Sequence, residues 1–184
     1  VGVGWFGVSG VSLGAAGVTL NIDAPAVGIR YWLNETIGLD VALGFGYTSA
    51  GGTVDTPDGI TDVQIASGFA LTLHGGIPIS VYHGEHYSFQ FVPEFDFGFG
   101  SGTQFGATPN DDQNVGAVFF QIGARAGAEV YFGFIGVPEL ALQATIGLGL
   151  GYQSGTLENG FADTRGSTIT TVNTLGLSTT VQEE

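Results

Sequence analysis

The stretch that decides the fold runs from Ile37 to Tyr47 and reads IGLDVALGFGY. Its residue types alternate without a break: one parity holds Ile37, Leu39, Val41, Leu43, Phe45 and Tyr47, and the other holds Gly38, Asp40, Ala42, Gly44 and Gly46. Successive side chains of a β-strand point to opposite faces, so this segment predicts a strand with one wholly apolar face. The other face is too small for an ordinary solvated surface. The pattern is typical of a narrow barrel whose outside touches lipid.

The composition favours one β-rich domain over residues 1–184. Hydrophobic residues make up 43% of the chain and charged residues only 11%, whereas soluble domains carry roughly 25% charged residues. The 33 glycines argue against helices, in which each glycine costs about 1 kcal/mol relative to alanine. No apolar run approaches the roughly 18 residues that a membrane helix needs. If the chain crosses a membrane, we therefore expect it to do so as a closed barrel.

The charge balance and the missing residue types exclude several classes of protein. The net charge is −14, there is no lysine, and the arginines are Arg30, Arg125 and Arg165. This balance disfavours nucleic acid and anionic membrane surfaces as partners. Without cysteine, disulfides and thiolate metal sites are impossible. The absence of an initial methionine leads us to expect a removed secretory signal.

Alternating segments separated by turn-forming and acidic residues predict eight strands. They fall near residues 3–14, 25–33, 37–49, 62–81, 87–100, 115–132, 138–153 and 167–181. Short connections (34–36, 83–86 and 133–137) alternate along the chain with long polar ones (50–61, 101–114 and 154–166). Short turns at one end and long loops at the other are typical of outer-membrane barrels.

One hairpin carries a resemblance to a known family. Val27 to Leu33 reads VGIRYWL, and a three-residue turn leads to Ile37-Gly38-Leu39-Asp40. Together with the hairpin rhythm, this segment resembles the OmpA/OmpX-like outer-membrane barrels of Gram-negative bacteria. The resemblance is architectural and covers the whole chain. It implies an all-β, eight-stranded antiparallel transmembrane up-and-down barrel in a bacterial outer membrane, with short turns in the periplasm.

The first connection fits this scheme least well. The segment from Ala15 to Asp23 is too apolar for a comfortable loop, and the alternation changes phase near Ala15-Ala16-Gly17. We expect either a β-bulge there or a longer first strand that ends near Leu20.

The apolar parity of the third and fifth strands predicts the lipid-facing side chains. These are Phe89, Phe91, Phe95, Phe97, Phe99, Leu39, Leu43 and Phe45. Tyrosines near the strand ends suggest an interfacial girdle, namely Tyr31, Tyr47, Tyr87, Tyr131 and Tyr152. The alternative is that these rows form the inner face of a soluble sandwich, because exposed phenylalanines would drive aggregation in water.

The opposite parity predicts a charge network inside the barrel. Its members are Arg30, Asp40, Glu94, Asp96, Arg125 and Glu129, with Gln90, Gln121, Gln143 and His74 beside them. Buried charges must pair, and four acids against two arginines leave a surplus. Either water enters, or one carboxylate takes up a proton. We expect the network to hold the strands in register rather than to transport a solute, although a narrow leak remains open as an alternative.

No residue set predicts catalysis or a defined metal site. His83, Glu85 and His86 share one short turn but lack a fourth zinc ligand. The long loops contain oxygen ligands that suit divalent cations, but at no EF-hand spacing; these are Asp55, Asp58, Asp62, Asn110, Asp111, Asp112, Glu158 and Asp163. No Ser/His/acid grouping is evident, so we expect neither an enzyme nor a cofactor.

The sequence as a whole predicts a non-enzymatic outer-membrane barrel with a structural or surface-interaction role. Its expected partners are membrane lipid and, at the acidic loops, proteins or divalent cations, but not nucleic acid. Two alternatives stay open: a secreted or fibre-forming soluble β-sandwich, and a small pore.

Overall fold

The protein is built almost entirely of long strands. The computed structural model describes the backbone of residues 1–15, 19–56, 59–105, 112–137, 140–158 and 163–182, and their side chains apart from Val8, 54–56, 59–64 and 173–182. The elements are β1 (Gly2–Leu13), β2 (Leu20–Trp32), β3 (Gly38–Thr56), β4 (Gly59–Gly76), β5 (Ile79–His83), β6 (Tyr87–Gln104), β7 (Gln113–Tyr131), η2 (Phe132–Ile135), β8 (Leu140–Glu158) and β9 (Asp163–Gln182). Within these ranges the only helical segment is the 3-10 turn η2.

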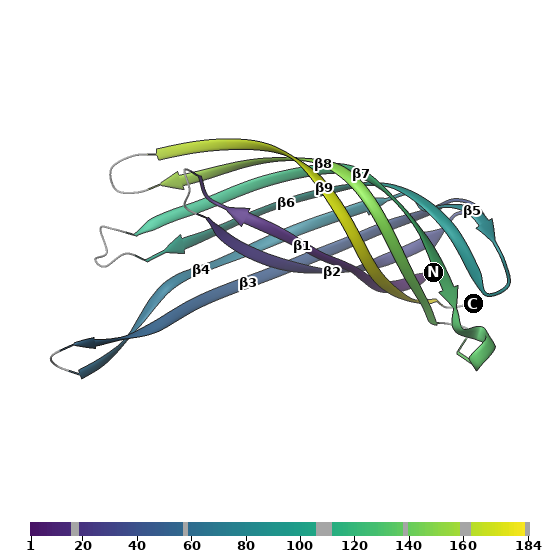
Figure 1. Ribbon diagram of the computed structural model, residues 1–184, viewed down its shortest axis with the longest axis horizontal. Coiled ribbons are helices and arrows are strands. Elements are labelled where there is room, and N and C mark those ends of the chain that lie inside the picture. The colour runs from purple at the N-terminus through teal and green to yellow at the C-terminus, as the bar shows by residue number, and fades with distance from the viewer. Residues whose placement is uncertain (16–18, 57–58, 106–111, 138–139, 159–162, 183–184) are drawn as a thin grey trace.

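The strands form one antiparallel sheet, which confirms the all-β prediction. Its order is β4-β3-β2-β1-β9-β8-β7-β6-β5, and β4 also pairs with β6. Figure 1 shows the sheet as a strongly curved, tilted array of strands. The predicted strand 62–81 is divided into β4 and β5, and Pro78, which has no N–H to donate, lies in the break. Both pieces pair with β6, so β5 continues the line of β4.

The three long loops were predicted to be longer than they are, because the strands continue into them. β3 and β4 stay paired as far as Thr56 and Gly59, and the β6–β7 and β8–β9 ladders also extend past the predicted strand ends. These extensions are rich in serine, threonine and glycine, so their sequence lacks the alternation in hydrophobicity that marks the central segments. We call this the long-hairpin end; it lies at the left of Figure 1.

The opposite end, here called the turn end, holds the short connections and both termini of the described chain (Figure 1). The Asn34 side-chain oxygen accepts hydrogen bonds from the backbone N–H groups of Thr36 and Ile37, at 2.9 and 2.8 Å. This local bonding is how asparagine stabilises tight turns. η2 ends at Gly136, whose φ of +86° lies in the left-handed region that glycine tolerates.

A β-bulge is present in the first strand, but ahead of the predicted place. The pairing of β1 with β2 shifts between Trp5 and Gly7, and Gly7 has a φ of +104°. The shift turns Val11 and Leu13 inward, where they are 1% and 0% exposed. The alternative of one strand reaching Leu20 is wrong, because β1 ends at Leu13. Two of the three residues at the predicted phase change, 16 and 17, lie outside the described residues.

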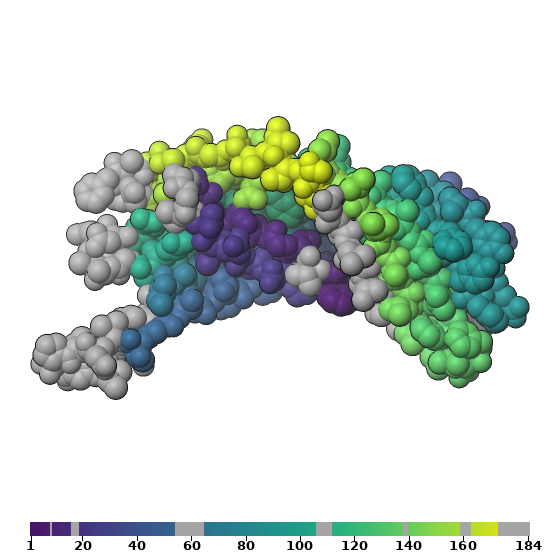
Figure 2. Space-filling model, in the orientation of Figure 1, coloured from purple at the N-terminus to yellow at the C-terminus, as the bar shows by residue number. Residues whose placement is uncertain are grey.

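The sheet is not closed into a complete barrel, which corrects the predicted architecture. β1 pairs with β9 only from Gly2 to Trp5, and β2 pairs with β3 only from Ala26 to Trp32. The remaining part of this hairpin, residues 7–13 and 20–25, leaves both neighbours; we call it the hairpin tip. The nearby Gly14 N–H donates to the Gly116 oxygen of β7, at 3.2 Å. In Figure 2 purple atoms of β1 lie between the yellow of β9 and the blue of β3 and β4.

Candidate functional site

The inner face of the sheet is divided into two zones of opposite polarity. Toward the turn end it buries polar side chains, here called the polar interior: Arg30, Asp40, Thr72, His74, Ser88, Gln90, Arg125, Glu129, Gln143 and Thr145. Toward the long-hairpin end it buries the apolar interior: Val11, Leu13, Ala15, Ile22, Ala70, Val115, Ala117 and Leu157. The boundary is sharp, since Ala70 and Thr72 are successive inward residues of one strand.

Arg30 is the centre of the polar interior and is 1% exposed. Its Nε and Nη2 groups donate to the two carboxylate oxygens of Asp40, both at 2.7 Å. This fork-to-fork geometry is the strongest form of arginine–carboxylate pairing. Arg30 and Asp40 face each other across the β2–β3 ladder. The guanidinium also lies 3.5 Å from a carboxylate oxygen of Glu129 on β7, so one side chain connects strands far apart in the sheet.

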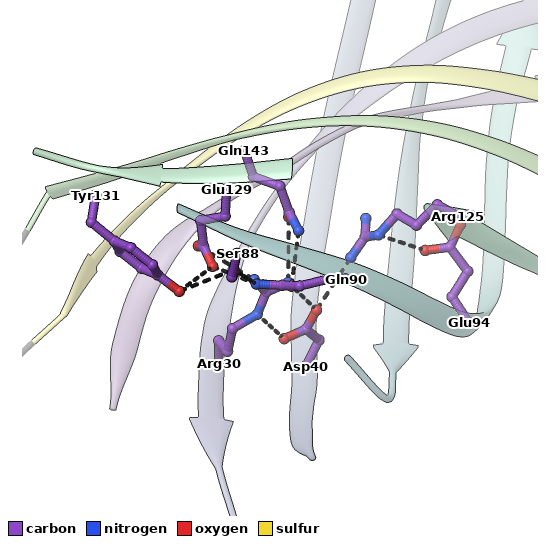
Figure 3. Close-up of polar contacts among 9 residues, drawn as sticks. All are labelled: Arg30, Asp40, Ser88, Gln90, Glu94, Arg125, Glu129, Tyr131 and Gln143. Atoms are coloured by element: carbon purple, nitrogen blue, oxygen red, sulfur yellow. Dashed lines mark hydrogen bonds and ion pairs between the residues drawn. The ribbon is translucent and has the colours of Figure 1, made fainter. Parts of the chain in front are cut away.

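Arg125 extends the ion-pair network toward β6. Its Nη2 donates to Asp40 at 3.2 Å, and its Nε lies 3.2 Å from Glu94 Oε2. The second contact is an ion pair without hydrogen-bond geometry, because both atoms lack a hydrogen-bond partner among the described residues. Asp40 is therefore shared between two guanidinium groups (Figure 3). Sharing of this kind compensates part of the predicted surplus of acids.

Amides and hydroxyls complete the network, and two of them were not predicted as members of it. Gln90 accepts from Arg30 at 3.1 Å and from Gln143 at 3.0 Å, and it donates to Ser88 and Glu129. The Tyr131 hydroxyl lies 3.1 Å from the Ser88 hydroxyl and 3.2 Å from Glu129, and it shares its one proton between them (Figure 3). Ser88 was missed in the sequence, and Tyr131 was predicted for the interfacial girdle, whereas its hydroxyl contacts the buried network. Ser88 has the same inward parity as Gln90, and this parity could have predicted that Ser88 faces the interior.

Asp96 lies apart from the arginine network, although the sequence placed it among those charges. Its carboxylate lies 2.8 Å from His74 Nδ1 and accepts from Gln121 at 3.4 Å. His74 and Asp96 are direct partners in the β4–β6 ladder. Five of the six predicted network residues therefore meet in one cluster, and the sixth forms a second one with His74 and Gln121.

The apolar interior is formed by the hairpin tip against the inner face of β4, β7 and β8. Glycines on the facing strands make room for it. A Cβ on Gly100 would come within 2.7 Å of the Leu13 side chain, and one on Gly155 would overlap the Gly14 oxygen. Gln153 donates to the Ser12 backbone oxygen and fixes the tip to β8. The tip explains the apolar residues described in the first connection: Ala15 and Ile22 are buried in the apolar interior, and Leu20 packs against it.

The outer face of the sheet is apolar around its middle. The eight residues predicted to face lipid are between 40 and 67% exposed. The same exposed row continues on other strands, with Val27, Ile29, Phe69, Leu71, Leu73, Val118, Phe120, Ile122, Ile146, Leu148 and Leu150. We call this surface the apolar belt. Tyr31, Tyr47, Tyr87 and Tyr152 are also exposed, between 43 and 65%.

The outer face becomes polar at the level where the inner face becomes apolar. Serines follow the belt on the same outward parity, at Ser49, Ser67, Ser101, Ser154 and Ser167. Ser49 is paired with Ser67, and Ser154 with Ser167, so the serines are neighbours across the ladders. The polarity of both faces is therefore inverted near one level of the sheet, which lies between Tyr47 and Ser49 on β3.

The other candidate residues form no site within the described part of the chain. No group of three or more His, Cys, Asp or Glu side chains there could hold a metal ion. In the turn, His86 Nε2 lies 3.9 Å from Glu85, while His83 faces Tyr131 instead. Asp58, Asn110 and Asp111 lie outside the described residues, as do the side chains of Asp55 and Asp62. No helix of the described chain is long and apolar enough to cross a membrane.

Comparison with known proteins found no relative of this chain. No family model matches it, and no curated protein and no solved structure matches it either.

Proposed function

We propose that the protein is a non-enzymatic β-barrel of a bacterial outer membrane, with a structural or surface-interaction role. The observation that carries this proposal is the apolar belt, because its exposed side chains come from most strands of the sheet and form continuous rows across their pairings. Soluble monomers rarely expose contiguous apolar patches above a few hundred Å². In a bilayer such a belt is the stable arrangement, and the inner face takes the polar groups.

The strand register supports closure in the membrane. From Gly2 the paired residues run through Arg30, Asp40, Gly76, Glu94, Gly123 and Gly149 to Val172 on β9. Gly2 itself pairs with Gln182, ten residues farther along β9. For eight strands this stagger corresponds to a tilt of about 40°, within the range of known barrels. Because hydrocarbon tolerates no unpaired strand edge, we propose that β1 and β9 pair further in lipid.

The height of the belt also fits a bilayer. On β8 the outward apolar row runs from Leu142 to Tyr152, which is about 33 Å along the strand and about 25 Å along a barrel axis at that tilt. The apolar band of outer-membrane barrels is about 25 Å tall. The long-hairpin end would then extend into water on the outer side, where its surface is available to proteins or divalent cations.

The interior argues against a pore. The polar interior blocks the turn end with direct side-chain contacts, and the hairpin tip fills the other end with apolar residues. Eight-stranded barrels are generally filled by side chains. We therefore expect no discrete conductance steps when the protein is added to planar bilayers.

Gel mobility tests the proposal. The outer-membrane fraction is extracted in mild detergent, and samples are run with and without boiling. We expect a compact, fast-migrating band that shifts on boiling. A urea-denatured sample, run without boiling, is the matched control and should migrate as the boiled one. A protein that stays in the soluble fraction or polymerises without detergent, and shows no shift, would contradict the barrel and favour the sandwich.

A further inference from the structure

Three buried polar atoms of the polar interior have no hydrogen-bond partner among the described residues. They are His74 Nε2, Glu94 Oε2 and Arg125 Nε. Their side chains are only 9, 7 and 10% exposed. Leaving a buried donor or acceptor unsatisfied costs roughly 1–3 kcal/mol, so such groups usually have an ordered water as partner. Three of them in one region therefore point to an occupant.

The three atoms belong to side chains that lie around Gly76, whose ladder partners are Asp40 and Glu94. Glu94 Oε2 lies 3.2 Å from Arg125 Nε, and Arg125 Nη2 also donates to Asp40 at 3.2 Å. A Cβ on Gly76 would lie 3.5 Å from His74 Nε2 and 3.1 Å from Val92 Cγ1. The absence of a side chain at Gly76 thus keeps a carbon atom away from the imidazole, and a Cβ there would also press on Val92.

We propose that the three atoms share one ordered water molecule beside Gly76. The hydrogen-bond roles balance: the water accepts from the Arg125 Nε–H and donates its two protons to Glu94 Oε2 and His74 Nε2. His74 Nε2 can accept in the neutral tautomer that has its proton on Nδ1, and Nδ1 lies 2.8 Å from the Asp96 carboxylate, which can only accept. A metal cation does not fit these roles, since the Arg125 N–H would point at it.

The water would connect two clusters of side chains in the described part of the chain. On one side lies the arginine network, which reaches Tyr131 through Glu129 and Ser88. On the other side lie His74, Asp96 and Gln121. A bridging water is nearly equivalent to a direct hydrogen bond. The polar interior becomes one connected network that spans β2, β3, β4, β6, β7 and β8.

The unmodified protein in micelles gives the first test, through NMR of ring-labelled histidine. The chain has three histidines, and His74→Gln assigns the signal of interest, while His83 and His86 in the exposed turn serve as internal references. We expect His74 to be protonated at Nδ1 and not at Nε2, with a magnetisation-transfer peak between water and the ring protons beside Nε2. A ring protonated at Nε2, or a missing water peak, would overturn the proposal.

Gly76→Ala is the matching variant, because its methyl group would lie 3.5 Å from His74 Nε2, where the water would bind. We expect loss of the water peak, with the heat-dependent gel shift retained as a check of folding. Gly10→Ala is the control, since among the described side chains the nearest atom to its Cβ would be Asp23 Oδ1 at 3.8 Å, and it should leave the peak unchanged. A peak that persists in Gly76→Ala contradicts the site. If that variant does not fold, the result on the unmodified protein decides.

The same spectra separate water from a bound cation. Exchanging sodium for a bulky organic cation should leave the His74 ring shifts unchanged if the occupant is water. A shift that depends on sodium would contradict the proposal and indicate an ion. None of these measurements depends on whether the barrel lies in an outer membrane.

Discussion

The two ends of strand β6 differ in which face carries the apolar side chains. On β6, Phe95 and Phe97 point outward while Asp96 points inward to His74. A few residues later Ser101 is exposed on the outer side, and on the inner side a Cβ on Gly100 would meet the Leu13 side chain. The strand geometry is the same at both ends. What differs is the face on which the apolar side chains lie.

The difference has a simple physical reading if the two ends lie in different solvents. In lipid, burying an apolar side chain inside the protein gains nothing over leaving it outside, so the interior can hold polar pairs. In water the hydrophobic effect places apolar side chains inside. The bulge at Gly7 contributes to the change from a polar to an apolar interior. It turns Val11 and Leu13 inward at the level where the inner face of the other strands becomes apolar.

The largest expected effect comes from the polar interior, at Arg30. Arg30→Met would leave Asp40 and Glu129 without their main partner, and we expect a loss of about 3–5 kcal/mol in the free energy of unfolding. Urea titration in lipid vesicles, followed by the fluorescence of Trp5 and Trp32, would measure it. Arg165→Met is the control, since this exposed arginine should cost about 0.5 kcal/mol or less. Equal losses would show that the network does not stabilise the fold.

The apolar interior should respond to a cavity. Leu13 is completely buried in the hairpin tip, so Leu13→Ala should cost about 2–5 kcal/mol. The matched change is Leu43→Ala in the belt, where the side chain is 67% exposed and its removal leaves no cavity. The same titration should therefore show a much smaller loss for Leu43→Ala. The reverse order would mean that the tip is not packed inside the sheet.

A charge on the outer face tests the two solvents directly. Phe95→Arg, in the middle of the belt, should cost roughly 2–4 kcal/mol in a bilayer, and Ser101→Arg, on the same face of the same strand, roughly 0–1 kcal/mol. Vesicle titrations of both variants give the comparison. Similar costs at both positions would place them in the same environment and remove the boundary between them.

The smallest expected effect is at the glycine beneath the tip. A Cβ on Gly155 would overlap the Gly14 oxygen, so Gly155→Ala should cost roughly 1–3 kcal/mol through overpacking. Gly166→Ala is a suitable control, because the nearest atom to its Cβ would be Ala15 Cβ at 3.6 Å. If Gly155→Ala is tolerated as well as the control, the tip does not rest on β8.

The sequence predicts the belt well because side-chain parity alone determines it. The alternation from Ile37 to Tyr47 assigns every outward and inward residue of that segment, and the Arg30–Asp40 pair follows from the same parity on two neighbouring strands. The strand extensions at the long-hairpin end were missed for the opposite reason. Serine, threonine and glycine differ little in polarity, so they give no periodic signal although their backbones pair fully.

Two other features depend on information that no local pattern contains. The hairpin tip turns inward because of a one-residue shift at Gly7, and nothing in Trp5-Phe6-Gly7 distinguishes a bulged glycine from a regular one. The separation of Asp96 from the arginines follows from the register between β4 and β6, which places His74 opposite it. Parity predicted that both residues face inward but not which residues would meet.

Site-directed spin labelling along the outer face of β6 tests the boundary most directly. The chain has no cysteine, so single cysteines at Phe91, Phe95, Phe99, Ser101 and Thr103 can each be labelled alone in vesicles. We expect the first three labels to be accessible to oxygen, which dissolves in lipid, and the last two to a water-soluble relaxation agent. Accessibility to the water-soluble agent at all five positions would contradict a membrane-embedded belt.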